Sequence, residues 1–75
     1  MLTAEFKRQA EELGRKAARA RYRRDDSLAS FMRECLTKLK AVVERADRAE
    51  LETIYCDAYR EEYQGVAGSA SMRRM

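Results

Sequence analysis

Thiols and carboxylates are the groups in this 75-residue sequence that could support catalysis. Cys35 and Cys56 are the two thiols, and Glu61 and Glu62 are adjacent carboxylates. A nucleophilic thiol needs a base beside it, most often histidine, and the sequence contains no histidine. Adjacent residues point about 100° apart on a helix, so the two glutamates are poorly placed to share acid and base roles. The sequence therefore predicts a protein that is not an enzyme and uses no cofactor or small-molecule substrate.

The same residues do not predict a metal site or a disulfide. Two cysteines without histidine are too few for a zinc cage. Residues 1–12 are charged and lack the apolar segment of a secretory signal, so we expect both cysteines to be free thiols in a reducing cytoplasm. No apolar run is long enough to span a bilayer, so no membrane association is expected.

Helices are the elements that must position these residues. The sequence is 45% hydrophobic and 39% charged, contains no proline, and therefore favours long two-faced helices. A first helix is predicted over about residues 3–23, with Thr3 as its N-cap. Its apolar stripe is narrow and rich in alanine, with members at Phe6, Ala10, Leu13, Ala17 and Ala20. Gly14 lies beside the stripe, where we expect it to let two backbones approach.

A second helix is predicted over 27–46, with Asp26 or Ser27 as its cap. Its apolar face covers well over a third of the helix circumference. The face consists of Leu28, Phe31, Met32, Cys35, Leu36, Leu39, Val42, Val43 and Ala46. A face this wide predicts that the second helix is the central element of the bundle, in contact with two neighbours, and that Cys35 is a small buried hydrophobe.

A third helix is predicted over 48–64, because Asp47 and Glu50 have the spacing of a capping box. Its core side would be Leu51, Ile54, Tyr55 and Ala58. One continuous helix over 27–64 is the alternative. Gly65 is the predicted helix end, which leaves 1–65 as a single domain and 66–75 as a disordered basic tail. The fold class is therefore all-α, either a small three-helix bundle or a helical hairpin with a long, kinked second helix, completed by oligomerisation.

Charge is distributed unevenly along the chain. Residues 1–24 hold eight basic and three acidic side chains, a net charge of +5, and 47–65 hold two basic and six acidic, a net charge of −4. Basic side chains form one ridge of the first helix, at Arg8, Arg15, Lys16, Arg19 and Arg23. This ridge could bind nucleic-acid phosphates. A solvated face competes with that interpretation, because glutamates precede two of these residues by four positions and the third helix is acidic.

Tyrosines recur every four residues in the third helix, at Tyr55, Tyr59 and Tyr63, and the last two should be partly exposed. Tyrosine is enriched at protein interfaces, although these rings could instead close the edge of the core. With Phe6 and Leu13, they are the predicted protein-interaction residues. Binding of a protein partner, a second copy or both is the expected function, as a regulator, inhibitor or adaptor. Nucleic-acid binding by the first helix is the alternative.

Overall fold

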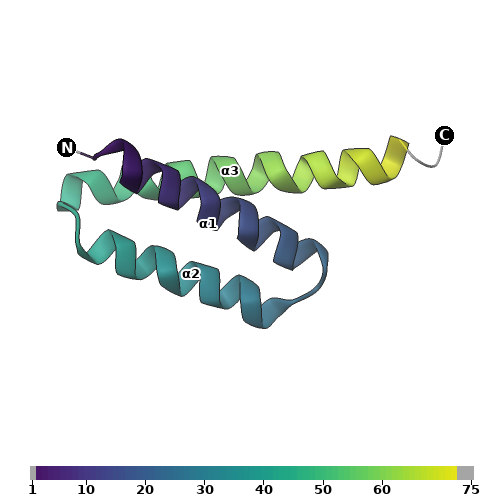
Figure 1. The fold of residues 1–75 in the computed structure, drawn as a ribbon, viewed down its shortest axis with the longest axis horizontal. Helices are drawn as coiled ribbons and strands as arrows, with labels where there is room; N and C mark the ends of the chain where they lie inside the picture. Colours follow the sequence, from purple (N-terminus) through teal and green to yellow (C-terminus); the bar gives the residue numbers. More distant parts are fainter. Residues whose placement is uncertain (1, 73–75) are drawn as a thin grey trace.

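The computed structural model describes residues 2–72, with only the backbone described for 66–72, and folds into three α-helices (Figure 1). α1 spans Ala4–Tyr22, α2 spans Asp26–Ala41 and α3 spans Arg45–Met72. The predicted all-α three-helix bundle is confirmed. The alternative of one continuous helix over 27–64 is wrong, because the chain leaves the helical path between α2 and α3.

The turn between α1 and α2 is a Schellman motif with arginine in the position that usually holds glycine. Arg24 has a φ of 62°, in the left-handed region. Its N–H donates to the Arg21 carbonyl at 3.0 Å, and the Asp25 N–H donates to the Ala20 carbonyl at 2.8 Å. These bonds satisfy two carbonyls at the end of α1, so the turn is closed without a glycine.

Asp25 is also the N-cap of α2. Its side chain accepts a hydrogen bond from the Leu28 N–H at 3.1 Å. The prediction of Asp26 or Ser27 as the cap is wrong, because the left-handed residue before Asp25 lets the second helix start immediately. At the start of α1 the predicted cap is confirmed, since Thr3 Oγ1 accepts from the Phe6 N–H at 3.3 Å.

α2 ends without a glycine or proline, at two β-branched residues. The N–H groups of Val42 and Val43 reach back three residues, to the carbonyls of Leu39 and Lys40, at 3.3 and 3.4 Å. The Lys40 carbonyl also accepts from Arg48 Nε of α3 at 3.0 Å. The predicted helix end at residue 46 is therefore wrong, because a side chain from the next helix satisfies the carbonyl that a longer α2 would have used.

α3 begins earlier and ends later than predicted. It starts at Arg45 instead of 48, so Asp47 lies inside the first turn and is not the cap, while Glu50 forms an ion pair with Lys7 at 3.6 Å. The helix continues through Gly65 to Met72. An interior glycine costs only about 1 kcal/mol against alanine, so Gly65 alone does not have to end the helix. The predicted end at 64 and the irregular tail from 66 are thus replaced by helix as far as 72, and 73–75 lie outside the described residues.

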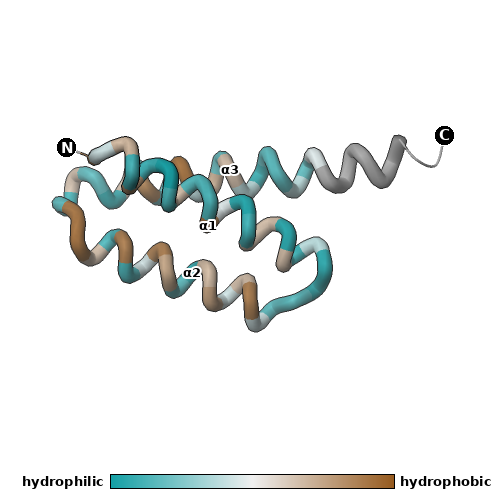
Figure 2. Tube along the Cα trace, in the orientation of Figure 1, coloured by the Kyte–Doolittle hydropathy of each residue, from teal (hydrophilic) through white to brown (hydrophobic). Residues whose placement is uncertain are grey.

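α1 is the central helix of the bundle, contrary to the prediction for the second helix. It packs against both α2 and α3, which touch each other over a short stretch only. Figure 2 colours α1 mainly as hydrophilic or intermediate and α2 as more hydrophobic, so hydropathy alone favours the wrong helix. The buried residues of α1 are small: Ala10, Gly14, Ala17, Ala18 and Ala20. Small side chains let two neighbours approach one helix closely, which explains its central position.

The core combines these small residues with larger side chains from the two outer helices. Leu36 of α2 and Leu51 of α3 are the largest side chains that are fully buried. The predicted core side of α3 is confirmed, with Leu51, Tyr55 and Ala58 buried and Ile54 partly buried. Gly14 lies where α1 meets α3, and a Cβ atom there would be 2.4 Å from the Tyr55 carbonyl oxygen. The expected close approach of two backbones at this glycine is confirmed.

Candidate protein-binding surface

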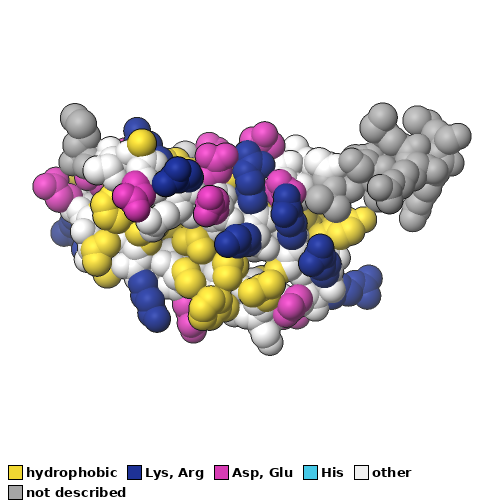
Figure 3. All heavy atoms as spheres, in the orientation of Figure 1, with side chains coloured by type: hydrophobic (Ala, Val, Ile, Leu, Met, Phe, Trp, Pro, Cys, Tyr) yellow, Lys and Arg dark blue, Asp and Glu magenta, His cyan; other side chains and the backbone are white. Residues whose placement is uncertain are grey.

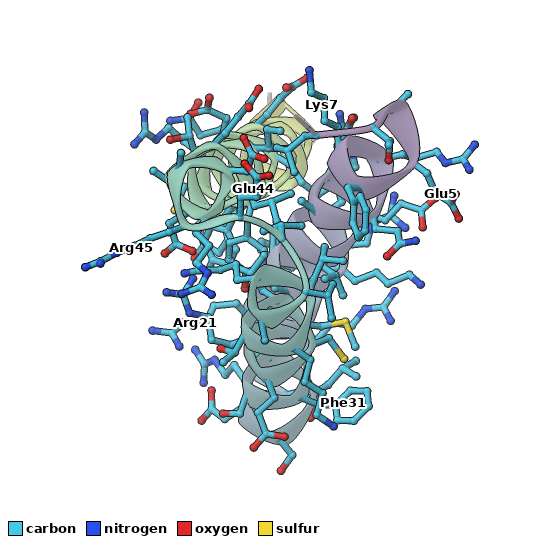
Figure 4. All side chains as sticks on the ribbon, turned by 90° about the vertical axis from the view of Figure 1, so that its left-hand side faces the viewer. Glu5, Lys7, Arg21, Phe31, Glu44 and Arg45 are labelled. Carbon is cyan, nitrogen blue, oxygen red and sulfur yellow. The ribbon has the colours of Figure 1, made fainter. Side chains whose placement is uncertain are left out.

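The outer side of α2 carries a continuous row of apolar side chains, here called the α2 stripe. Its members are Leu28, Phe31, Cys35 and Leu39 of α2, together with Val42, the C-cap residue directly after the helix. Their spacings of three, four, four and three residues place them on one face of the helix. Phe31 is 54% exposed, Val42 70% and Leu28 41%, while Cys35 and Leu39 are half-buried. Figure 4 shows the Phe31 ring pointing away from the bundle.

A groove runs beside the α2 stripe, between α2 and α1. Phe6 and Leu13 form its α1 wall, and Leu39, Cys35 and Val42 form its α2 wall. Its volume is about 520 Å³, and its polar lining residues are Gln9, Glu12, Lys16 and Lys38. Phe6 and Leu13, which the sequence predicts as interaction residues, therefore lie at this groove, partly buried. Figure 3 shows hydrophobic side chains gathered over the same region, between α1 and α2.

The stripe is exposed because of how α2 is packed. Met32 and Leu36 face the core and are buried, whereas the stripe lies on the neighbouring side of the helix. α2 packs mainly against α1 and touches α3 over a short stretch, so no helix of the described chain covers this side. Periodicity alone predicts all these apolar residues as core. An apolar face that is wider than one helix contact requires is the signal that could have identified the stripe.

The predicted tyrosine residues form a stacked row along α3. The rings of Tyr55 and Tyr59 are 6.4 Å apart, and those of Tyr59 and Tyr63 are 6.1 Å apart and nearly parallel. Tyr22 of α1 meets Tyr63 edge-on at 6.1 Å. Tyr59 is half-buried and Tyr63 is 40% exposed, which confirms their predicted partial exposure. A second groove, of about 440 Å³, lies along Tyr59 and Tyr63, and the exposed free thiol of Cys56 lines it.

Tyr55 belongs to the core and not to the exposed edge. Its side chain is only 7% exposed, and the Arg33 guanidinium lies 5.4 Å from its ring centre. Burial raises the pKa of the Tyr55 phenol above its usual value. The tyrosine rings stack on one another, and Tyr63 also meets Tyr22. Fewer aromatic faces are therefore free for a partner than the sequence suggests.

The two oppositely charged parts of the sequence meet within the molecule. Glu62 of α3 accepts hydrogen bonds from Arg19 Nε at 2.9 Å and from Arg15 Nη1 at 3.2 Å. These bonds, the one from Arg19 foremost, lower the pKa of the Glu62 carboxyl. Arg15 also pairs with Glu11 at 2.9 Å, as the four-residue spacing predicted. Two arginines of the predicted basic ridge are therefore already bound to carboxylates.

The rest of the basic ridge, Arg8, Lys16 and Arg23, is exposed. A second ion-pair cluster joins α2 to α3, where Glu52 accepts from both terminal nitrogens of Arg33, at 2.6 and 3.0 Å, and from Lys40 at 3.4 Å. The hydrogen bonds from Arg33 lower the pKa of the Glu52 carboxyl. Both clusters hold α3 onto the other helices, so their arginines serve the fold.

The two cysteines and the adjacent glutamates, which the sequence offers as possible catalytic groups, do not lie together in one site. Cys35 lies in the α2 stripe, Cys56 is on the surface of α3, and both are free cysteines. Glu62 is bound to two arginines, and Glu61 is 3.9 Å from Arg15. Within the described residues, His, Cys, Asp and Glu side chains do not assemble in groups of three or more that could hold a metal ion.

Comparison with known proteins gives no match to a family model, a curated protein or a solved structure. Across the described part of the chain, none of the helices combines the length and the apolar character that a membrane crossing requires. Three of the five large apolar side chains that are exposed in the described chain, Leu28, Phe31 and Val42, lie in the α2 stripe.

Proposed function

We propose that this protein is a binding module, not an enzyme, and that it acts by docking another protein chain on the α2 stripe and the α1–α2 groove. An apolar row along one helix beside a groove suits a partner that presents an amphipathic helix. The partner's apolar side chains would cover the stripe and enter the groove between Leu13 and Leu39. Regulation, inhibition or adaptor activity would follow from that contact.

The exposure of Phe31 carries the proposal. A large aromatic side chain that is 54% exposed, in line with Leu28 and Val42, leaves apolar surface in water in a chain that has little core to spare. Contiguous exposed apolar surface on a small protein is typical of interaction sites. Aromatic side chains are also the residues that contribute most to binding at the centre of interfaces.

Binding of nucleic acid by α1 has weaker support. Arg15 and Arg19 would have to leave Glu62 before they could bind phosphates. Neutralisation within the chain reduces the charge available for counterion release, which is the main source of affinity for nucleic acid.

The two free thiols support a reducing compartment such as the cytoplasm.

A capture experiment tests the proposal. The tagged full chain is incubated with native extract, with and without nuclease, and the bound proteins are identified by mass spectrometry. Phe31→Glu should abolish capture, because it puts a charge in the middle of the apolar stripe. Tyr63→Glu is the matched control, since it changes an aromatic residue that is 40% exposed on a different surface.

The outcomes separate the alternatives. Partners that resist nuclease, are lost with Phe31→Glu and are kept with Tyr63→Glu support docking on α2. Partners lost with Tyr63→Glu alone would move the interface to the tyrosine row and overturn the proposal. Capture that is lost on nuclease treatment, and is also lost when Arg8 and Arg23 are substituted, would favour the nucleic-acid alternative.

A further inference from the structure

The partner on the α2 stripe can be identified further from the order of its residues. We propose that a second copy of this chain covers the stripe, by antiparallel pairing of α2 with α2 about a two-fold axis at Cys35. This inference rests on the proposed function, since it uses the same surface. It adds the occupant, the orientation and the register.

The spacing of the stripe residues is symmetric about Cys35. Phe31 and Leu39 lie four residues before and after it, and Leu28 and Val42 lie seven residues before and after it. In an antiparallel pair centred on Cys35, Phe31 of one copy therefore lies opposite Leu39 of the other, and Leu28 lies opposite Val42. Phe31 of each copy would lie over Leu39 of the other, at the edge of the groove that Leu13 and Phe6 line. A two-fold axis requires such a self-complementary surface.

The charges beside the stripe favour the antiparallel orientation. Glu34 and Lys38 lie near Cys35 on the same flank of the stripe, where Lys38 also lines the groove, and neither forms an ion pair within the described residues. At 1.5 Å of rise per residue, antiparallel pairing brings Lys38 of one copy to within about 3 Å of the level of Glu34 in the other. In a parallel two-fold pair this flank of one helix would face the opposite flank of the other, so Glu34 and Lys38 would not meet. Antiparallel pairing places the same flank of both copies side by side and therefore brings these opposite charges together.

The size of the surface sets the expected strength. α2 contains 16 residues, which gives a contact about 24 Å long. One helix of this length, with the groove beside it, offers less than the roughly 800 Å² per partner of a standard stable interface. The dimer should therefore dissociate with a Kd on the order of 1–100 µM.

Sedimentation equilibrium of the full chain across this concentration range measures the assembly. The unchanged chain should convert from monomer to dimer, and no further. Phe31→Glu should raise the Kd by about 30-fold or more, because a central aromatic anchor is lost. Tyr63→Glu should leave the Kd unchanged. Circular dichroism of each variant at low concentration checks that the monomer is folded.

Disulfide trapping measures orientation and register without relying on a disruptive variant. In a Cys56→Ser background, oxidation should link two copies through Cys35. In a second background with Cys35→Ser and Cys56→Ser, chains carrying Leu28→Cys are mixed with chains carrying Val42→Cys. Antiparallel pairing predicts cross-links between the two kinds of chain only. Two Leu28→Cys positions would lie about 21 Å apart along the axis, far beyond the reach of a disulfide.

Each result has one meaning. A dimer with Leu28→Cys to Val42→Cys cross-links supports the proposal, and a dimer that links Leu28→Cys to itself overturns the antiparallel pairing. A chain that stays monomeric at the highest concentration and does not cross-link overturns the second copy as occupant. In that case, nuclease-resistant capture that is lost with Phe31→Glu would still support docking of a different protein, so the two proposals fail separately.

Discussion

Replacing Gly14 with alanine tests the packing of α1 against α3, on which the whole arrangement depends. In an isolated helix this substitution stabilises, because glycine is about 1 kcal/mol less favourable than alanine. In this bundle the added Cβ would lie 2.4 Å from the Tyr55 carbonyl oxygen and 3.1 Å from both Ala58 Cβ and Tyr59 N. None of these three atoms can rotate away, since two belong to the backbone and one is a Cβ.

The magnitude follows from the movement that the new atom requires. Ordinary carbon contacts lie at about 3.5–4.0 Å, so α3 would have to shift by about 1 Å from α1. Overpacking of this kind costs about 1–3 kcal/mol, which outweighs the gain of about 1 kcal/mol in helix propensity. We expect Gly14→Ala to lower the free energy of unfolding by about 1–2 kcal/mol. For a chain of this size the Tm should fall by about 5–15 °C.

Gly65→Ala is the matched control. Gly65 is also inside a helix, and a Cβ there would have no neighbour within 4 Å. Its replacement should therefore raise the free energy of unfolding by about 0.5–1 kcal/mol. Thermal and urea unfolding followed by circular dichroism at one fixed protein concentration measures both variants. If Gly14→Ala stabilises the protein as Gly65→Ala does, the close approach of α1 and α3 is wrong.

Three further predictions concern the turn, the ion pairs and the stripe. Arg24→Gly should stabilise the protein by about 0.5–1 kcal/mol in urea unfolding, because glycine adopts the left-handed φ of 62° without a steric cost. Arg23→Gly is the control and should not stabilise the protein, because Arg23 has a φ of −82°. Glu52 and Glu62 have lowered pKa values in the folded state, so the stability they contribute is present above their ordinary pKa of 4.5 and is lost as the pH falls through the folded-state pKa. Glu62→Gln should therefore cost about 0.5 kcal/mol at pH 7 and reduce the loss of stability between pH 5 and pH 3, and an unchanged acid dependence would show that this ion pair does not form. Alkylation of Cys35 should slow as the protein concentration rises while that of Cys56 stays constant, and equal rates for Cys35 at all concentrations would contradict burial of the stripe by a second copy.

Periodicity predicted much of the local structure. The three helices, the Thr3 cap and the core side of α3 at Leu51 and Tyr55 follow from the spacing of apolar and capping residues, which depends only on neighbours along the chain. The partial exposure of Tyr59 and Tyr63 follows from the angle at which a four-residue repeat drifts around the helix. The position of Gly14 beside the alanines likewise indicated a close contact.

The relative placement of the helices did not follow from periodicity. Periodicity predicts the wide face of α2 as core, yet α1 is central, because its small side chains allow close contacts on two sides. Since α2 packs mainly against α1, the side of α2 that carries Phe31 is left exposed. The end of α2 was also missed, since it depends on Arg48 reaching the Lys40 carbonyl from another helix. Pairing of Arg15 and Arg19 with Glu62 could be expected only in general terms, from the complementary charge of the two segments.

Covalent capture at Val42 tests most directly whether protein covers the α2 stripe. Val42 is 70% exposed, so a photoreactive phenylalanine analogue can replace it, and exposed Asp57 on α3 provides the control position. After irradiation in native extract, mass spectrometry should find a nuclease-resistant protein adduct from position 42 and none from position 57. If a second copy is bound, the adduct from position 42 should have twice the mass of the chain. The absence of a protein adduct at position 42, or equal capture at both positions, would contradict the proposed interface.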